Sequence, residues 1–130
     1  MLEVVSTNAA PNPVGPYSQA IKANGFVFAA GQLPLDPATQ QIVGGGIAQQ
    51  AERALQNVSA LLEAAGSSMN KVVRCVVLLK TMNDFSAMNE VYAGFFKENP
   101  PARTILEAAR LPKDCLIEIE ATALDSGGET

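Results

Sequence analysis

One arginine and two glutamates near the C-terminal end have the types and spacing to act on a small organic acid. Arg103 comes shortly after a rigid Pro-Pro pair, and Glu118 and Glu120 alternate with apolar residues in the segment Ile117–Ala121. In a strand this alternation places both carboxylates on one face and the apolar side chains on the other. Arginine holds a carboxylate through two parallel hydrogen bonds. We therefore predict that Arg103 binds the carboxylate of a small acid, while Glu118 positions a water molecule beside it.

The chain between these residues predicts a β-hairpin over residues 100–123, with its turn at Leu111–Asp114. Such a hairpin would bring Arg103 close to both carboxylates. Two other interpretations are open: Arg103 forms only a salt bridge with Glu118 or Glu120, or Glu118 is simply a surface carboxylate.

The remaining elements supply the framework. Apolar residues at helical spacing predict a helix over residues 47–65 that ends at Gly66, and a second helix that begins near Asn83. Short apolar runs predict strands near residues 2–6, 18–23, 26–32 and 72–79. The order is β-β-β-α-β-α-β-β, within a single domain spanning residues 1–130, and the polar tail after Ala123 is expected to fray.

Three local features carry expectations of their own. The apolar run Phe26–Ala30 predicts a strand segment covered on both faces. Residues 34–46 predict a loop without a phosphate-binding fingerprint. The β-branched run over residues 72–79 predicts a central strand. Arg74 interrupts that run, and we expect a salt bridge to an acidic residue on a neighbouring strand, such as Glu120.

Composition excludes several classes of site. The chain has 130 residues, no histidine and a net charge of −4. Without histidine, Ser-His-Asp and Cys-His nucleophile systems and the usual histidine metal sites are excluded. The acidic balance argues against nucleic acid as the main partner. Cys75 and Cys115 are expected to be buried, reduced thiols. No run reaches the length of a membrane span, and the N-terminus resembles no targeting signal, so we expect a cytoplasmic protein.

Two helices can cover only one face of a sheet of this size. The other face would then expose strands rich in Val, Phe and Ala, and large exposed apolar patches mark interfaces. An oligomer is therefore expected on physical grounds.

Several motifs occur in a fixed order along nearly the whole chain. They are Gly15-Pro16-Tyr17-Ser18-Gln19-Ala20, Ala30-Gly31-Gln32-Leu33-Pro34, Asn83-Asp84-Phe85 with Asn89, and Pro101-Ala102-Arg103 followed by Leu111-Pro112 and Ile117-Glu118-Ile119-Glu120-Ala121. Together they resemble the Rid (YjgF) family, specifically its reactive-intermediate deaminases. The resemblance implies an α+β, chorismate-mutase-like fold, with a mixed six-stranded sheet and two helices on one face. It also implies a homotrimer with pockets between the subunits.

The resemblance further implies a hydrolase that needs neither metal nor cofactor. Its substrates would be 2-iminobutanoate and 2-iminopropanoate, formed from the enamines that pyridoxal-phosphate dehydratases release, and its products a 2-keto acid and ammonia. The matching positions assign the carboxylate to Arg103 and the water to Glu118. The resemblance also places four other residues around the pocket. Tyr17 would lie at its lip, Gly31 and Ile105 would contribute their backbone groups, and Asn89 would lie near it.

This sequence departs from many relatives at two places. Ala30 stands where many carry serine, and Ile105 stands where several carry a reactive cysteine. Both changes are expected to affect substrate preference rather than water chemistry. Two alternative functions are open: a non-catalytic trimer that binds small carboxylates or acts like a chaperone, and an RNA-cleaving inhibitor of translation.

Overall fold

The computed structural model describes residues 2–125. The elements follow in the order β1 (Glu3–Val5), β2 (Ala20–Ala23), β3 (Phe26–Gln32), β4 (Leu35–Asp36), β5 (Gln41–Ile42), α1 (Ile47–Ala64), β6 (Val72–Leu79), α2 (Phe85–Phe95), β7 (Ala102–Glu107) and β8 (Ile117–Leu124). Six strands form one mixed sheet in the order β1-β2-β3-β8-β6-β7. The α+β class, with a mixed six-stranded sheet, is confirmed.

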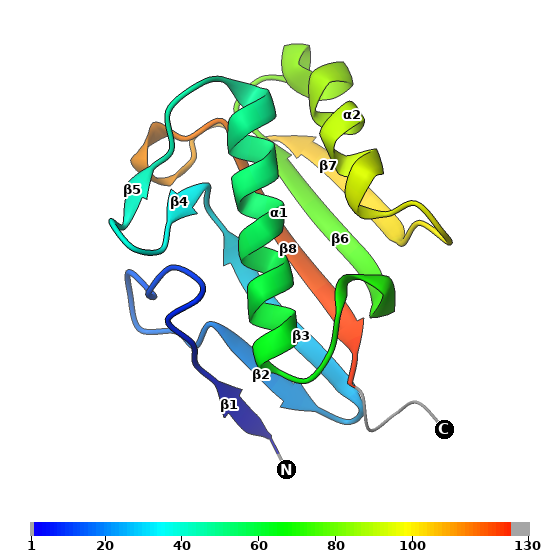
Figure 1. The fold of residues 1–130 in the computed structure, drawn as a ribbon. Helices are drawn as coiled ribbons and strands as arrows, with labels where there is room; N and C mark the ends of the chain where they lie inside the picture. The colour runs from blue at the N-terminus through cyan, green and yellow to red at the C-terminus, as the bar shows by residue number, and fades with distance from the viewer. Residues whose placement is uncertain (1, 126–130) are drawn as a thin grey trace.

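Both helices cover the same face of this sheet (Figure 1). Helix α1 packs on β3 and β8 and also touches α2. Its predicted apolar stripe is buried, with Leu55, Val58, Leu61 and Leu62 completely removed from solvent. Gly66, at φ 85°, follows the end of the helix, as predicted. Neither helix in residues 2–125 is long and apolar enough to cross a membrane.

The alternating segment forms a strand, as predicted. Ile117, Ile119 and Ala121 of β8 are buried under the helices. Glu118 is half-buried and Glu120 is exposed, and both face away from the helices. The strand runs on to Leu124, one residue beyond Ala123, where fraying was expected to begin. Residues 126–130, the rest of the tail for which fraying was expected, lie outside the described part of the chain.

The predicted hairpin over residues 100–123 is wrong. Strand β7 pairs in parallel with β6, and β8 pairs antiparallel with the other edge of β6. The predicted turn is present as a short helical turn at Pro112–Asp114. The chain nevertheless uses it to cross over β6 instead of folding β8 back onto β7. The predicted central position of β6 is confirmed, because this strand has a partner on each side.

The sheet face opposite the helices carries exposed apolar side chains. Val27 and Ala29 of β3 point into the core, so Phe28 between them points outward and is 47% exposed. Val4 on β1 and Leu106 on β7 are 58% and 54% exposed. The expectation that β3 is covered on both faces therefore fails for one chain on its own. We call this surface, centred on the outward residues of β3, β8 and β6, the open face.

Two smaller expectations also need correction. Residues 34–46, predicted as a loop, contain the short antiparallel pair β4–β5, in which Leu35 lies opposite Ile42. Arg74 donates to the Thr104 hydroxyl at 3.4 Å on the neighbouring strand β7, in place of the predicted salt bridge to Glu120.

Candidate functional site

Arg103 lies on the helix-facing side of the edge strand β7, directly opposite the buried Cys75 of β6. Its Nη1 donates to Oδ1 of Asn89 on α2 at 2.8 Å. The guanidinium carbon lies 4.7 Å from the ring centroid of Tyr92 and 5.9 Å from that of Phe85. Three residues of one helix thus hold the cation, and the Nε–Nη2 edge stays available for a carboxylate.

Helical spacing explains this arrangement. Phe85, Asn89 and Tyr92 are four and three residues apart along α2, so their side chains share the face that meets β7. Tyr92 is buried, and its hydroxyl is the single buried side-chain polar atom in residues 2–125 without a hydrogen-bond partner. Burial raises the pKa of this phenol, and the neighbouring Cys75 thiol raises it further. Burial likewise raises the pKa of Cys75. Both groups are therefore neutral beneath the guanidinium.

A groove of about 520 Å³ opens beside Arg103, between α2 and the start of β7. Arg103 and Asn89 supply its polar groups. The rest of its lining consists of aromatic rings, proline rings and one methyl group, from Tyr92, Ala93, Phe96, Pro100 and Pro101. We call this the Arg103 groove. It combines one fixed cation with an apolar wall, which suits a carboxylate attached to an apolar group.

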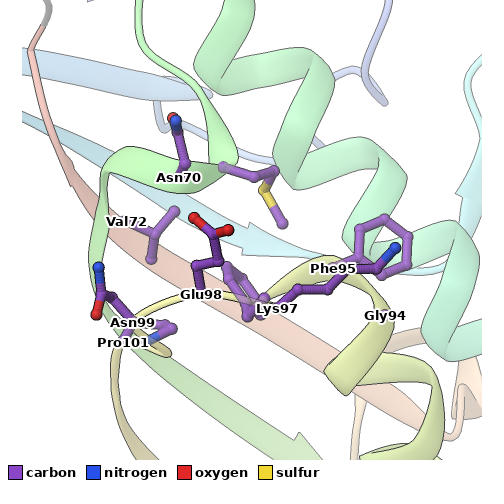
Figure 2. A pocket seen from close by; sticks show the side chains of 10 residues that line it. Asn70, Val72, Gly94, Phe95, Lys97, Glu98, Asn99 and Pro101 are labelled. Atoms are coloured by element: carbon purple, nitrogen blue, oxygen red, sulfur yellow. The ribbon is translucent and has the colours of Figure 1, made fainter.

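A second hollow of about 350 Å³ lies beyond the end of α2, and the two share Phe96 and Pro101 as a common wall. Figure 2 shows the ends of the Lys97 and Glu98 side chains directed to different parts of this hollow. The amide of Asn70 also lies well apart from that of Asn99 in the same view. Because its polar groups do not converge, this hollow lacks the arrangement that orients a small ligand.

Glu118 lies on the open face, where it lines a hollow of about 120 Å³ with Glu120, Gly31, Val76 and Leu78. Its carboxylate packs directly on the backbone of Gly31. A Cβ atom added at Gly31 would come within 2.9 Å of the Glu118 Cδ and would overlap the carboxylate oxygen. The resemblance gave Gly31 as a position in the pocket, and in one chain the group that approaches its backbone closely is the Glu118 carboxylate.

The surroundings of Glu118 in the folded chain stabilise its protonated form relative to a glutamate in water. Partial burial raises the pKa of this carboxyl, and the negative charge of Glu120 raises it further. A carboxylate with a raised pKa is a better proton acceptor than an ordinary surface glutamate. The position can therefore remove a proton from water.

Tyr17 is connected to Glu118 by way of Gly31. Tyr17 and Gly31 line the same small cleft, and the Glu118 carboxylate packs on Gly31. Its ring is 48% exposed, and its hydroxyl accepts from the Val14 amide at 3.2 Å. The buried amide of Gln19 fixes this loop by donating to the Pro11 carbonyl at 2.8 Å. The Gln19 carbonyl in turn accepts from the amide of Ala30 at 2.9 Å, beside Gly31.

The structure separates the predicted site residues into two groups. Arg103 is opposite Cys75, Cys75 is opposite Ala121, and Glu118 lies three residues before Ala121 on β8. With strands about 4.8 Å apart and residues about 3.3 Å apart, the Arg103 and Glu118 Cα atoms are offset by about 10 Å in each direction of the sheet. Their side chains also point to opposite faces. We call the two groups the Arg103 half-site and the Glu118 half-site.

Asn89 belongs to the Arg103 half-site, and Gly31 and Tyr17 belong to the Glu118 half-site. Ile105 shares the face of Arg103 two residues further along β7, but its side chain packs against the core. Tyr92 was not predicted as a site residue, although its ring contacts Arg103. The available signal was its position three residues after Asn89, on the same helix face. Within residues 2–125, no group of three or more His, Cys, Asp or Glu side chains could hold a metal ion.

Comparisons with known proteins identify the family of this chain. Residues 7–125 match the family described as Endoribonuclease L-PSP. A RutC family protein of Pyrococcus horikoshii is 58% identical over 123 residues, 95% of this chain and 98% of its own. The human 2-iminobutanoate/2-iminopropanoate deaminase is 46% identical over 121 residues, covering 93% and 88% of the two chains.

Among solved structures, Escherichia coli TdcF with bound serine superimposes with a TM-score of 0.91 at 38% identity, covering 95% of this chain and 99% of TdcF. Similarity of this extent, over almost the whole chain, settles the family. The chain belongs to the Rid (YjgF) family, the group described as Endoribonuclease L-PSP.

Proposed function

We propose that this protein is a deaminase that hydrolyses 2-imino acids, with 2-iminobutanoate and 2-iminopropanoate among its substrates. The observation that carries the proposal is the fixed guanidinium of Arg103, which keeps one donor edge free beside an apolar groove. The human relative is named for this activity, and TdcF was solved with serine, an amino acid that carries a carboxylate.

The reaction needs few protein groups, because a protonated imine is already electrophilic at C2. Arg103 binds the substrate carboxylate through two charge-assisted hydrogen bonds. Water attacks C2 of the C=N group while the Glu118 carboxylate takes one of its protons. The resulting carbinolamine loses ammonia, with the proton returned to the leaving nitrogen. One imino acid and one water thus give one 2-keto acid and one ammonium ion.

The raised pKa of Glu118 suits this role. General bases work best when their pKa lies close to the working pH, and both burial and Glu120 move Glu118 in that direction. Glu120 lies two residues away on the same strand face and is exposed. We assign it the electrostatic effect on Glu118 and no direct part in the reaction.

The proposal requires at least two copies of the chain, because Arg103 and Glu118 lie on opposite faces of one sheet. We propose a homotrimer in which the Arg103 half-site of one copy meets the Glu118 half-site of the next. The exposed apolar residues of the open face, including Phe28 and Leu106, supply a surface that such an assembly would bury. Sedimentation equilibrium measures the assembly directly, and a monomer at assay concentration would contradict it.

The decisive experiment is a coupled assay in which an amino-acid oxidase generates the imine and keto-acid release is followed. We expect the protein to accelerate release without added metal, and Glu118→Gln to lower the rate by about a hundred- to ten-thousand-fold. Binding of a 2-keto acid should survive that substitution and be lost in Arg103→Ala. Glu120→Gln is the matched control, and we expect it to stay within a few-fold of the parent rate. No acceleration with any small imino acid would remove the enzymatic proposal.

Two other functions make different predictions. A non-catalytic carboxylate-binding or chaperone-like trimer would bind keto acids through Arg103 but show no rate for Glu118→Gln to reduce. RNA cleavage is suggested by the family description, but the absence of histidine and the net charge of −4 disfavour it. An RNA-cleavage assay with Arg103→Ala as control separates intrinsic activity from a contaminant. The cytoplasmic location, and a role in limiting damage by reactive metabolites, stay predictions.

A further inference from the structure

The strands of the main sheet place three charged side chains on the open face within residues 2–125. Strand β8 contributes Glu118 and Glu120, and β6 contributes Arg74, the single cation. Lys22 and Arg103 point to the helix side instead, because each lies opposite a buried residue of the neighbouring strand. Since Glu118 is assigned to the reaction, Arg74 and Glu120 are the two charges of this face that have no function so far.

Arg74 and Glu120 stay unpaired within one chain. The guanidinium of Arg74 turns toward the edge of the sheet, where it donates to the Thr104 hydroxyl at 3.4 Å. Neither side chain takes part in an ion pair with another residue in the described part of the chain. In water an unpaired charge costs little, but a buried one is strongly destabilising. An assembly that covers the open face must therefore supply an opposite charge to each of them.

The junction proposed above can supply both partners at once. Arg74 lies one residue and one strand away from Arg103, a Cα separation of about 6 Å, and the two cations lie on opposite faces beside the β7 edge. Glu118 and Glu120 lie about 7 Å apart on a single face. A β7 edge laid across that face of the next copy presents two cations to two carboxylates at matching spacing. The contact that joins Arg103 to Glu118 then also brings Arg74 to Glu120.

We propose that Arg74 of one copy forms an ion pair with Glu120 of the next copy, once at each junction of the homotrimer. Such a contact is heterologous, and it closes into a ring when each copy gives its Arg74 to one neighbour and its Glu120 to the other. The inference rests on the proposed assembly. It adds the pair of charges that decides which surface of one copy meets which surface of the next, and in what register.

The test measures the dissociation constant of the assembly by sedimentation equilibrium of the full-length protein over a range of concentrations. Arg74→Glu and Glu120→Arg each place like charges across the junction, so each should raise this constant by about tenfold or more. Arg74→Gln and Glu120→Gln remove one charge without reversing it, and we expect a smaller rise in the same direction. These two variants also replace a charge-reversal variant that fails to fold. At concentrations where Glu120→Gln is fully assembled, its rate should still stay within a few-fold of the parent rate.

Mixing the two charge-reversal variants tests whether the pair crosses between copies. Where a copy with Arg74→Glu precedes a copy with Glu120→Arg, opposite charges meet again, and the reverse junction holds the wild-type pair. Two junctions in three of any mixed trimer are then attractive, so the mixture should assemble more tightly than either variant alone. An ion pair inside one chain predicts no gain on mixing, because each variant carries two like charges in the same chain.

Glu63→Arg is the matched control, because it makes the same change of charge as Glu120→Arg at an exposed position of α1, on the helix side of the sheet. It should leave the dissociation constant within about twofold of the wild-type value. If the wild-type protein assembles but Glu120→Arg behaves like Glu63→Arg, or if mixing restores nothing, the ion pair is wrong while the homotrimer stands. A wild-type protein that stays monomeric at every concentration overturns both the assembly and the pair.

Discussion

The two half-sites differ in how the protein treats the charge at their centre. Around Arg103, a neutral amide accepts one hydrogen bond and the Tyr92 ring supports one face, so the cation is stabilised without being neutralised. Around Glu118, burial and a second carboxylate disfavour the charge. The salt bridge considered from sequence does not form within one chain, because the groups lie on opposite faces of the sheet. Separation inside the chain leaves both groups free to act on a third molecule.

The strongest test of this comparison is to supply the two halves on different chains. Arg103→Ala and Glu118→Gln should each lower activity by about a hundredfold or more. If the half-sites meet only between copies, co-assembly of equal amounts should restore about a quarter of wild-type activity, because about one junction in four receives both intact halves. The measurement is the coupled assay on proteins unfolded and refolded together. A mixture no more active than its parents would show that the halves do not combine across copies.

A smaller effect is expected from crowding the Glu118 half-site. Gly31→Ala places a methyl group against the glutamate carboxylate, which must then move. We expect the rate constant to fall about tenfold, by loss of alignment with the water, while keto-acid binding at Arg103 changes little. Gly44→Ala is the control, because a Cβ added at Gly44 meets nothing within 4 Å. Equal effects of the two substitutions would contradict a positional role for Gly31.

The support beneath Arg103 should contribute less. Tyr92→Leu removes the ring, and a cation–π contact of about 1 kcal/mol corresponds to a roughly fivefold increase in KM. Tyr92→Phe keeps a ring and removes the hydroxyl that lacks a hydrogen-bond partner. Its free energy of unfolding should stay within about 1 kcal/mol of the parent value, and it should not fall. Steady-state kinetics with denaturant unfolding separates these outcomes, and a Tyr92→Phe defect as large as that of Tyr92→Leu would mean that the hydroxyl matters.

The smallest predicted effect is on pH dependence. Since burial and Glu120 raise the pKa of Glu118 above its ordinary 4.5, the acid limb of the rate profile should have its midpoint above pH 4.5. Glu120→Gln should move that midpoint down. Because the folded state holds the Glu118 proton to higher pH than the unfolded state, this group's contribution to stability falls as pH rises through the interval between the two pKa values. Glu118→Gln should remove this group's contribution to the fall in the free energy of unfolding with rising pH. An unchanged pH dependence of stability would contradict the proposed environment of Glu118.

Local patterns predicted the elements better than their partners. The apolar stripe of α1 and the alternation of β8 are visible in the sequence because each fixes which side chains are buried. Strand pairing is not fixed in this way. Strand β6 is apolar enough to pair along both edges, and the chain after Glu107 is long enough to cross it. The site residues proposed from the sequence stay predictions, whereas the predicted hairpin is wrong. The contact of Tyr92 with Arg103 depends on the parallel β6–β7 pairing that was missed.

If the two half-sites meet only between copies, the opposite placement of Arg103 and Glu118 on the sheet would also make activity depend on protein concentration. Such a site would be lost on dilution, because a separated chain keeps Arg103 on one surface and Glu118 on another. Specific activity should then fall steeply below the dissociation constant of the assembly and recover on concentration. Activity in the cell would then depend on whether the protein is expressed at a concentration high enough for assembly.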